Sequence, residues 1–427
     1  MKKAIVKPKK VKKRNWRDHF KPSENFKLDK NYPKPTVFVA MSGGVDSSVA
    51  AYLLKKEGYQ VVGVFMKNWS FPEVSLKHCQ LFKDYKDMVE VCKFLKIPYL
   101  VFSFEKEYKK RVMERFFREY KTDRTPNPDI LCNTEIKFDL FLKKAIKLGA
   151  DLIATGHHIR RKCANDQLSI TNGQCKKYHL LKGKDAIKDQ TYFVYNLTQN
   201  QLSHCLFPIG EYSKDQIRKI AHKLGLPTAY KRDSQGICFI GRINVKDFLK
   251  TKIAEREGNI VDMKGNVLGK HEGAWFYTIG QRRIDGLSGT TKPLYVVATD
   301  VKKNLVIVGP DRATYRKGVI LEKFHLIDKS YFSCHPERSV AKSKDLIKQI
   351  PRQARNDRGK SGNESYGGLT AKPRYGPEVY PGKLEKRGRT WRFMFTKPQR
   401  ALTPGQSLVI YDKDVCLGGG VIKKIIN

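Results

Sequence analysis

The sequence predicts an α/β protein with a doubly wound, mostly parallel sheet, followed by a small β-rich central domain and a C-terminal β-barrel-like domain. Three observations predict this class. Short apolar runs alternate with helical stripes over the first two thirds of the chain. Turn signals then recur at short intervals from residue 258, and the chain ends in strand patterns such as SLVIY and GGGVIKKI. A length of 427 residues suits two or three domains.

The α/β part alternates strands and helices. We expect strands in the apolar runs at 36–41, 60–66, 98–104 and 150–156. We expect helices around 49–54 (ended by Gly58), over 88–95, from about Glu105 to Tyr120 and from Ile136 to Leu148. Ligands of such sheets bind beyond the carboxyl ends of the strands, which is where SGGVDSS (42–48), Met66 and TGHH (155–158) lie. The sequence therefore places the site there.

The chain divides into four parts. Residues 1–35 are expected to form a disordered basic tail, 36–240 the α/β domain, 241–312 the small β-rich domain and 313–427 the barrel-like domain. Within the last of these, residues 333–366 are polar, basic and poor in β-branched residues, which predicts a low-complexity surface insert. An added RNA-binding arm is the alternative interpretation of this insert.

The net charge indicates a polyanionic partner. Lys and Arg exceed Asp and Glu by 84 to 42, a formal charge of +42. The first 35 residues hold 13 Lys/Arg and 3 Asp/Glu, so the rest of the chain still carries +32. Such an excess of positive charge is self-repulsive unless a polyanion neutralises it, and nucleic acid is the expected partner. A proteome that is basic throughout would also produce this charge.

The remaining composition indicates a cytoplasmic protein. No run of 18 apolar residues is present, and the Lys-rich start lacks the apolar region of a secretory signal. The nine cysteines are odd in number and include no C-x-x-C pair. We therefore expect thiols used singly in a reducing compartment, with no disulfide framework or zinc ribbon. We expect no membrane association and a monomer.

The heptad SGGVDSS has the composition of an anion-binding loop. It lacks the Lys of a P-loop and the spaced glycines of a dinucleotide fold. Adjacent glycines let the backbone approach a phosphate, and the following helix offers its N-terminus. We expect Asp46 to cap that helix and the serines to add hydroxyl donors. A lone Gly-Gly turn is more often structural, but the whole heptad between a strand and a helix favours function.

The heptad resembles the signature of the N-type ATP pyrophosphatases, the PP-loop family with its adenine nucleotide alpha hydrolase-like fold. These enzymes cleave ATP to AMP and pyrophosphate while adenylating a substrate. Five further stretches resemble the tRNA-specific 2-thiouridylases over about residues 36–427, apart from the insert. They are TPNPDILCNTEIKF (125–138), LGADLIATGHH (148–158), KDQTYFVY (188–195), DSQGICFIG (233–241) and TPGQSLVIYDKDVCLGGG (403–420).

The resemblance implies ATP-dependent thiolation of the wobble uridine in tRNA, through an O2 adenylate that sulfur then replaces. ATP and Mg²⁺ are the implied cofactors, and no residue is assigned as a metal ligand. Residues matching the family's ATP site are Ala40, Met41, Ser42, Gly43, Gly44, Val45, Asp46, Ser47, Met66 and Gly156. Mg²⁺ would neutralise charge on the phosphates as pyrophosphate leaves.

Two cysteines match the family's catalytic pair. Cys238 corresponds to the persulfide carrier, and Cys132 to the nucleophile that either assists release of the sulfur or attacks the adenylated carbon. A single Cys in an apolar run such as ICFI is more often a core residue. Cys132 is expected to start a helix, whose dipole would lower its pKa. Asp129 matches a proposed acid/base, and a helix-capping role is its alternative. An iron–sulfur cluster held by Cys132, Cys238 and a neighbour stays open, because no cluster spacing is visible.

The implied partners are the anticodon region of tRNA and a sulfur-donor protein, either a relay protein or a desulfurase. The target base would have to leave the anticodon stack, at a cost of a few kcal/mol. His157 is the weakest assignment, because a His after a strand is often a structural residue. The residues matching the family's tRNA contacts are Asn127, Pro128, Asp129, His157, Lys188, Asp189, Gln190, Arg374, Tyr375 and Gln406.

Two other functions compete with this interpretation. GMP synthetase, argininosuccinate synthetase and 4-thiouridine synthase share the heptad; the first two need no Cys132/Cys238 pair, and the third carries extra modules that this sequence lacks. A non-catalytic tRNA-binding protein would be expected to lose Asp46, Cys132 or Cys238, and all three are present.

Overall fold

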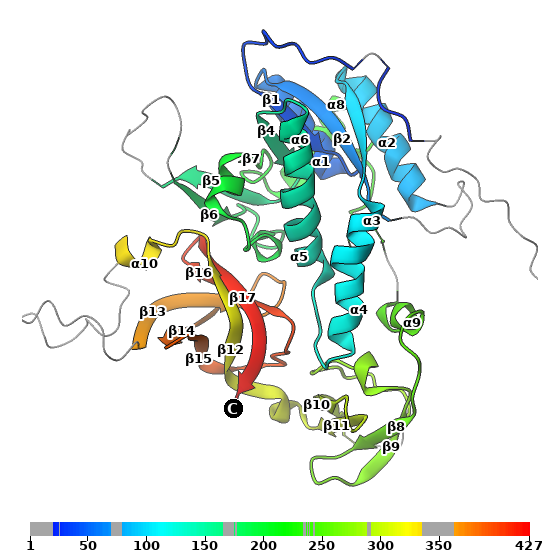
Figure 1. Cartoon of the computed structure of the whole chain (residues 1–427), viewed down its shortest axis with the longest axis vertical. Helices are drawn as coiled ribbons and strands as arrows, with labels where there is room; N and C mark the ends of the chain where they lie inside the picture. The colour runs from blue at the N-terminus through cyan, green and yellow to red at the C-terminus, as the bar shows by residue number, and fades with distance from the viewer. Residues whose placement is uncertain are drawn as a thin grey trace, which may run out of the picture.

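The parallel sheet and the barrel lie at different ends of the molecule, with long helices between them (Figure 1). The computed structural model describes residues 20–427 except 25, 70–78, 165–174, 176, 234–235, 237, 239, 242–243, 288–291 and 335–362. Within this part of the chain, no helix is long and apolar enough to cross a membrane.

The first sheet has five strands in the order β3-β2-β1-β4-β7, and every pairing is parallel. The strands are β1 (Thr36–Ala40), β2 (Gln60–Lys67), β3 (Tyr99–Ser103), β4 (Leu152–Thr155) and β7 (Cys205–Leu206). The central strand β1 is buried along its whole length, which explains its unbroken apolar sequence. The four strands that the sequence predicted are confirmed, and β7 is a short edge strand that it missed.

Both faces of this sheet are covered, as a doubly wound sheet requires. Val37 and Val39 pack in one core cluster with three helices, α1 (Val45–Lys56), α2 (Gln80–Leu95) and α8 (Lys214–Leu224). Phe38 and Val62 point to the other face, into a cluster formed by the helices between 105 and 147. The period-2 alternation of strand side chains produces these two cores. The predicted doubly wound α/β class is confirmed.

Two continuous helical rods cover the second face and run toward the other domains (Figure 1). One consists of α3 (Glu105–Tyr108), the π-helical η3 (Lys109–Met113) and α4 (Glu114–Tyr120), as the sequence predicted. The other consists of α5 (Pro128–Cys132), the π-helical η4 (Asn133–Phe141) and α6 (Leu142–Lys147). It starts earlier than the predicted Ile136, because Asn127 caps it and Pro128 occupies its first turn.

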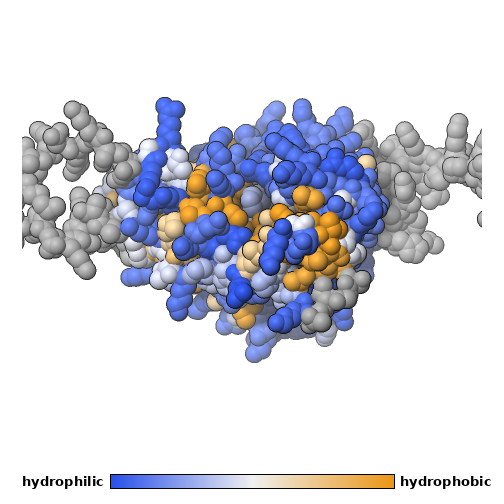
Figure 2. Space-filling view, turned by 90° about the horizontal axis from the view of Figure 1, so that it is seen from below, coloured by the Kyte–Doolittle hydropathy of each residue, from blue (hydrophilic) through white to orange (hydrophobic). Residues whose placement is uncertain are grey.

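The second half of the chain forms two β-sheets. The small sheet has the order β10-β11-β8-β9, and Figure 2 shows this end of the molecule as mostly hydrophilic with a few apolar patches. The barrel closes because β12 pairs with both β15 and β17. The strands are β8 (Gly258–Val261), β9 (Val267–His271), β10 (Tyr295–Asp300), β11 (Leu305–Gly309), β12 (Tyr315–Leu326), β13 (Asn363–Lys372), β14 (Tyr380–Arg387), β15 (Thr390–Arg400), β16 (Ser407–Asp412) and β17 (Val415–Ile426).

One hairpin links the two halves of the molecule. β5 (Ile159–Cys163) and β6 (Tyr178–Lys182) lie inside the range predicted for the α/β domain, yet β6 pairs with β17 and extends the barrel sheet. A disulfide joins Cys163 to Cys175 beside this hairpin. The expectation that all thiols are used singly is therefore wrong for these two cysteines, because the hairpin brings them together.

The predicted tail and insert differ in part from the structure. Phe20 is buried against Phe65 and Tyr85, and Phe26 and Leu28 pack on the other core cluster. Part of the tail predicted to be disordered over 1–35 is therefore packed on the α/β domain. Residues 1–19 and 335–362 lie outside the described residues. The two ends of the insert range 333–366 belong to α10 (Tyr331–Cys334) and β13. The remaining short helices are η5 (Thr191–Phe193), α7 (Gln199–Ser203), α9 (Val245–Lys250), η6 (Ala274–Phe276) and η7 (Asp311–Thr314).

Candidate active site

The SGGVDSS heptad forms a tight turn between β1 and α1. Gly43 has a φ of 72°, and a Cβ on it would lie 2.1 Å from the Asp84 carbonyl oxygen. Gly156, just after β4, is equally constrained, because a Cβ there would lie 2.7 Å from the Ser47 amide nitrogen. The turn and the end of β4 therefore touch through glycine. Glycine is therefore required at both positions, because a side chain there would clash with the backbone packed around the N-terminus of α1.

Asp46 does not cap α1, contrary to the expectation from sequence. The N-cap is Gly44, which offers no side-chain cap, and Asp46 is the second residue of the helix. Its Oδ1 accepts a hydrogen bond of 2.6 Å from Lys214 Nζ, and His158 Nε2 lies 3.5 Å from the same oxygen. Burial alone would raise the pKa of Asp46, but His158 and Lys214 together lower it below its usual value. Asp46 is therefore held as a carboxylate.

A cluster of cations and carboxylates connects this turn to the segment that carries Cys238. Lys214 Nζ also pairs with Asp233 Oδ1 at 2.8 Å, and Asp233 further binds Lys188 and Arg218. Burial opposes the charge of Asp233, yet hydrogen bonds from Lys214 and Lys188 lower its pKa to about 2. Lys231 Nζ donates to the Gly43 carbonyl oxygen at 2.9 Å. Sequence analysis missed Lys214, Asp233 and Lys231, whose charges look like an ordinary solvated surface.

The two predicted catalytic cysteines meet. The Sγ atoms of Cys132 and Cys238 lie 3.7 Å apart, and Cys132 is fully buried. Asp129 Oδ1 accepts a 2.8 Å hydrogen bond from the Cys238 amide, and the Tyr108 hydroxyl donates to the Cys238 carbonyl at 2.7 Å. The main chain at Cys238 is thus held on both sides. This geometry brings together three residues that the sequence assigned separately.

The ionisation of the two thiols differs from the expectation for Cys132. Cys132 is the last residue of α5 and continues into η4, so it does not start a helix. Burial raises its pKa well above the usual value, and its hydrogen bond to Cys238 raises it further. The same hydrogen bond, together with the charge of Lys137, lowers the pKa of Cys238 in spite of burial. Cys238 is therefore the readily ionised thiol, because desolvation outweighs any helix dipole at Cys132.

Asp129 also differs from its alternative interpretation. The cap of α5 is Asn127, whose side-chain oxygen accepts from the amides of Asp129 and Ile130. Asp129 instead positions Cys238 through the amide hydrogen bond. Burial raises the pKa of Asp129, with the Cys238 amide and Lys137 opposing that shift. A carboxyl group with a raised pKa suits proton exchange with a substrate.

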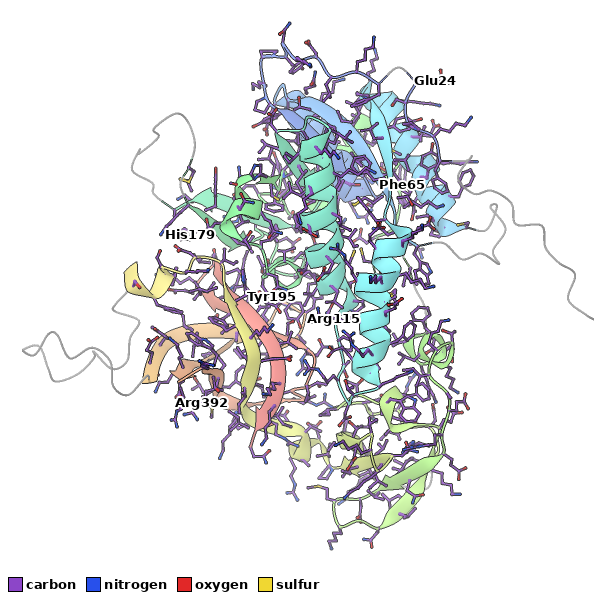
Figure 3. All side chains as sticks on the ribbon, viewed as in Figure 1. Glu24, Phe65, Arg115, His179, Tyr195 and Arg392 are labelled. Atoms are coloured by element: carbon purple, nitrogen blue, oxygen red, sulfur yellow. A yellow bond between two sulfur atoms is a disulfide. The ribbon has the colours of Figure 1, made fainter. Side chains whose placement is uncertain are left out.

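The predicted tRNA residues fall into two groups around this site. Asn127 and Pro128 open α5, and Gln406 Nε2 donates to the Thr125 carbonyl oxygen at 3.0 Å, so the barrel touches the same segment. Gly405 is required at this contact, since a Cβ there would lie 2.7 Å from the Thr125 amide nitrogen. Tyr195, labelled in Figure 3 between the helices and the barrel, reaches Ser407 Oγ at 3.0 Å.

The second group surrounds the turn at 188–190. Asp189 is buried, and its carboxylate accepts from Lys372 Nζ at 2.8 Å and from Thr191, so it is occupied inside the protein. Gln190 Oε1 accepts from the His158 amide, and the Tyr375 ring lies 4.5 Å from the Phe193 ring, tilted by 37°.

His157 is likewise buried, with its Nδ1 2.7 Å from Thr155 Oγ1, and burial lowers its pKa well below the usual value. Arg374 donates to the Arg400 carbonyl oxygen. Arg374 and Tyr375 are exposed and Lys188 is partly exposed, whereas Asp189 and His157 are buried.

The turn fits a nucleotide with a divalent cation. Its glycines and the start of α1, which has no side-chain cap, suit phosphate oxygens. Asp46 provides one carboxylate, which suits Mg²⁺ because this ion is usually bound by one or two carboxylates together with substrate phosphates. Met41 and Met66 are buried beside the turn. Among the described residues, no three His, Cys, Asp or Glu side chains gather where they could hold a metal ion by themselves.

Comparison with known proteins identifies the family of this chain. A family model described as the tRNA methyl transferase HUP domain matches residues 35–242, one described as the tRNA methyl transferase PRC-barrel domain matches 246–310, and one described as the aminomethyltransferase beta-barrel domain matches 356–422. The tRNA-specific 2-thiouridylase MnmA of Alkaliphilus oremlandii is 44% identical over 402 residues, covering 92% of this chain and 99% of that protein. The chain belongs to the tRNA-specific 2-thiouridylase family.

A second member of the 2-thiouridylase family shows similar coverage. The tRNA-specific 2-thiouridylase MnmA of Lysinibacillus sphaericus is 43% identical over 393 residues, covering 92% of this chain and 95% of that protein. The resemblance drawn from the short motifs is therefore confirmed over nearly the whole chain.

Proposed function

We propose that the protein uses ATP to convert the wobble uridine of tRNA to 2-thiouridine, as a tRNA-uridine 2-sulfurtransferase. The observation that carries this proposal is the 3.7 Å approach of Cys132 and Cys238 beside Asp129. The same chain carries the SGGVDSS turn after β1. The matched family models are named for methyl transfer, but two adjacent thiols suit sulfur transfer. Relatives at 43–44% identity are named for that reaction.

The first step is adenylation of the base. The SGGVDSS turn would bind the phosphates of ATP. Mg²⁺ would be held by Asp46 and the phosphate oxygens, and it would neutralise the negative charge of the phosphates. Asp129, whose pKa burial raises, would accept the N3 proton of uridine. O2 then attacks the α-phosphate and pyrophosphate leaves. The carbonyl oxygen is thereby converted into part of AMP, which is a good leaving group.

The second step transfers sulfur and uses both thiols. The terminal sulfur of a Cys238 persulfide attacks C2, a C–S bond forms, and AMP departs with the O2 atom. The thiolate of Cys132 then attacks Sγ of Cys238, which breaks the S–S bond to the base and forms a Cys132–Cys238 disulfide. Asp129 returns its proton to N3. The transferred sulfur gains the two electrons that the cysteine pair loses, so a dithiol or other thiol reductant must reset the pair before another turnover.

The tRNA would lie across the surface where α5, the turn at 188–190 and the barrel meet. Lys188, Arg374 and Tyr375 are available there, and the positive charge of the chain supplies backbone affinity. Asp189, through Lys372, would fix the turn against β13 as a positioning residue. The proposal further includes a monomeric cytoplasmic enzyme that receives its sulfur from a donor protein.

Mass spectrometry of tRNA nucleosides tests this function. Unmodified anticodon-containing tRNA is incubated with the protein, ATP, Mg²⁺ and a persulfide-generating donor, and the product is digested. We expect 2-thiouridine at the wobble position and one AMP for each modified base, with Cys238→Ala giving none. A methylated nucleoside, or AMP formed on a small molecule without tRNA, would instead favour another PP-loop reaction. Binding of tRNA without any AMP would favour the non-catalytic alternative.

A further inference from the structure

Lys137 lies in the thiol site beside Cys132, Cys238 and Asp129. It is in the π-helical segment η4, five residues after Cys132. Because a π-helix closes its turn between residues i and i+5, this segment places the Lys137 side chain on the same face as Cys132. The Lys137 side chain hydrogen-bonds Cys238 and interacts electrostatically with Cys132 and Asp129. One ammonium group therefore adjoins both thiols and the carboxylate.

We propose that Lys137 is a catalytic residue, whose ammonium group binds the reacting sulfur of Cys238 and neutralises the anions formed during sulfur transfer. The inference rests on the proposed function, since it assigns a role within that reaction. It adds a cation to the pair of thiols and the carboxylate that the sequence identified.

The charge balance of the site explains why a cation is needed. Asp129 and a Cys238 thiolate or persulfide would be two anions in a buried space beside a third ionisable group, Cys132. The uncompensated burial of such charges costs several kcal/mol. Lys137 remains charged there, because the neighbouring Cys238, Cys132 and Asp129 raise its pKa although burial opposes this.

The neighbouring groups Tyr108 and His157 do not supply the positive charge that Lys137 provides. Tyr108, from α3, faces the same thiols, but burial raises its pKa strongly and it stays neutral while donating to the Cys238 carbonyl. His157, after β4, is also near Lys137, and burial keeps that imidazole uncharged. Among the described groups that interact with Cys238, Lys137 is the cation.

The role in the two chemical events follows from the contact with Cys238. When the persulfide attacks C2, its terminal sulfur must be an anion. The Lys137 ammonium group beside Cys238 stabilises this negative charge. When Cys132 attacks Cys238 Sγ, a thiolate approaches that same sulfur in a buried site. Lys137 neutralises this approaching charge, whereas Cys132 alone has a pKa that burial holds well above the usual value.

Alkylation of Cys238 measured against pH tests the contact without tRNA or ATP. Iodoacetamide labelling is quantified at Cys238 by peptide mass spectrometry for the wild type and for Lys137→Arg, Lys137→Gln and Lys137→Met. We expect Lys137→Met and Lys137→Gln to raise the labelling midpoint by about one pH unit or more, and Lys137→Arg to stay near the wild type. Lys143→Met is the matched control, since Lys143 lies on α6 of the same rod and its side chain is 75% exposed.

Single-turnover thiolation then tests the catalytic role. In persulfide-loaded protein, Lys137→Met should slow sulfur transfer about 100-fold or more, with tRNA affinity nearly unchanged and partial rescue in Lys137→Arg. An unchanged labelling midpoint in folded Lys137→Gln, or thiolation by Lys137→Met at the wild-type rate, would overturn the role of Lys137. A wild-type protein that makes no 2-thiouridine would instead refute the proposed function while leaving the labelling result intact.

Discussion

The Sγ atoms of Cys132 and Cys238 lie 3.7 Å apart, although 106 positions separate the two residues along the chain. Asp129 and Tyr108 produce this approach by binding the amide and the carbonyl of Cys238. The two thiols are unequal, because Cys132 is fully buried and Cys238 is half-buried. Sulfur can therefore reach Cys238 from outside while Cys132 stays shielded.

Mild oxidation should join Cys132 to Cys238 and inactivate the protein until it is reduced. Bond formation needs only a small movement, since the sulfurs already touch. Peptide mapping without reductant should find this bond beside the one between Cys163 and Cys175. Cys92, buried in the other core cluster, serves as the internal control and should stay free.

Persulfide labelling should show different roles for Cys132 and Cys238. Cys238→Ser should form no persulfide, whereas Cys132→Ser should keep the persulfide but fail to complete thiolation. A persulfide found in Cys238→Ser, on Cys132 or another cysteine, would contradict these roles.

The reactivity of Cys238 should depend on the hydrogen bond from Cys132. That bond lowers the pKa of Cys238, so its thiolate persists at a lower pH than that of a free thiol, whose pKa is about 8.5. Cys132→Ala removes the donor and should move the alkylation midpoint upward. Cys132→Ser keeps a hydroxyl donor and should move it less. Equal midpoints in the two variants would show that the hydrogen bond does not set the pKa of Cys238.

Asp46→Ala should abolish the conversion of ATP to AMP and leave tRNA affinity almost unchanged. The carboxylate is held ionised by its contacts with His158 and Lys214, which are not among the residues proposed to bind tRNA. Asp215→Ala, which changes an exposed acid in the first turn of α8, is the control and should retain activity. Pyrophosphate release by Asp46→Ala at the normal rate would disprove the assignment of the turn.

Lys372→Met should lower the free energy of unfolding by about 3–5 kcal/mol, because it leaves the Asp189 carboxylate buried without its partner. Both side chains of this pair are 1% exposed. Lys397→Met, an exposed change on the same barrel, should cost less than about 0.5 kcal/mol. Urea denaturation of both variants checks this. Similar midpoints would show that the pair does not support the contact between the barrel and the turn at 188–190.

Local patterns predicted the fold and the family resemblance identified the thiols, but neither showed the contacts between distant segments. The period of the apolar residues was enough for β1 to β4, and the glycines of the heptad for its turn. Nothing in the local pattern of β6 shows that it pairs with β17, because the pairing depends on how the barrel docks. The raised pKa of Cys132 was missed for the same reason, since burial there comes from several distant elements.

The charged residues of the site illustrate this limit most clearly. Lys214 bridges Asp46 and Asp233, yet in the sequence it is one of 84 basic residues. Lys137 differs from its neighbours on the helix only because η4 turns it toward Cys238. Asp189 was predicted to contact tRNA, while the fold uses its carboxylate to bind Lys372. The roles of Lys214, Lys137 and Asp189 therefore depend on the direction in which the fold points each side chain.

The central claim is that sulfur passes from Cys238 to tRNA while the cysteine pair becomes oxidised. The most direct measurement loads Cys238 with a ³⁴S persulfide, removes the donor, adds tRNA, ATP and Mg²⁺ for one turnover, and analyses both products by mass spectrometry. The account predicts one ³⁴S in 2-thiouridine at the wobble position and one Cys132–Cys238 disulfide for each base modified. Thiolated tRNA without ³⁴S, or with both thiols still reduced, would contradict it.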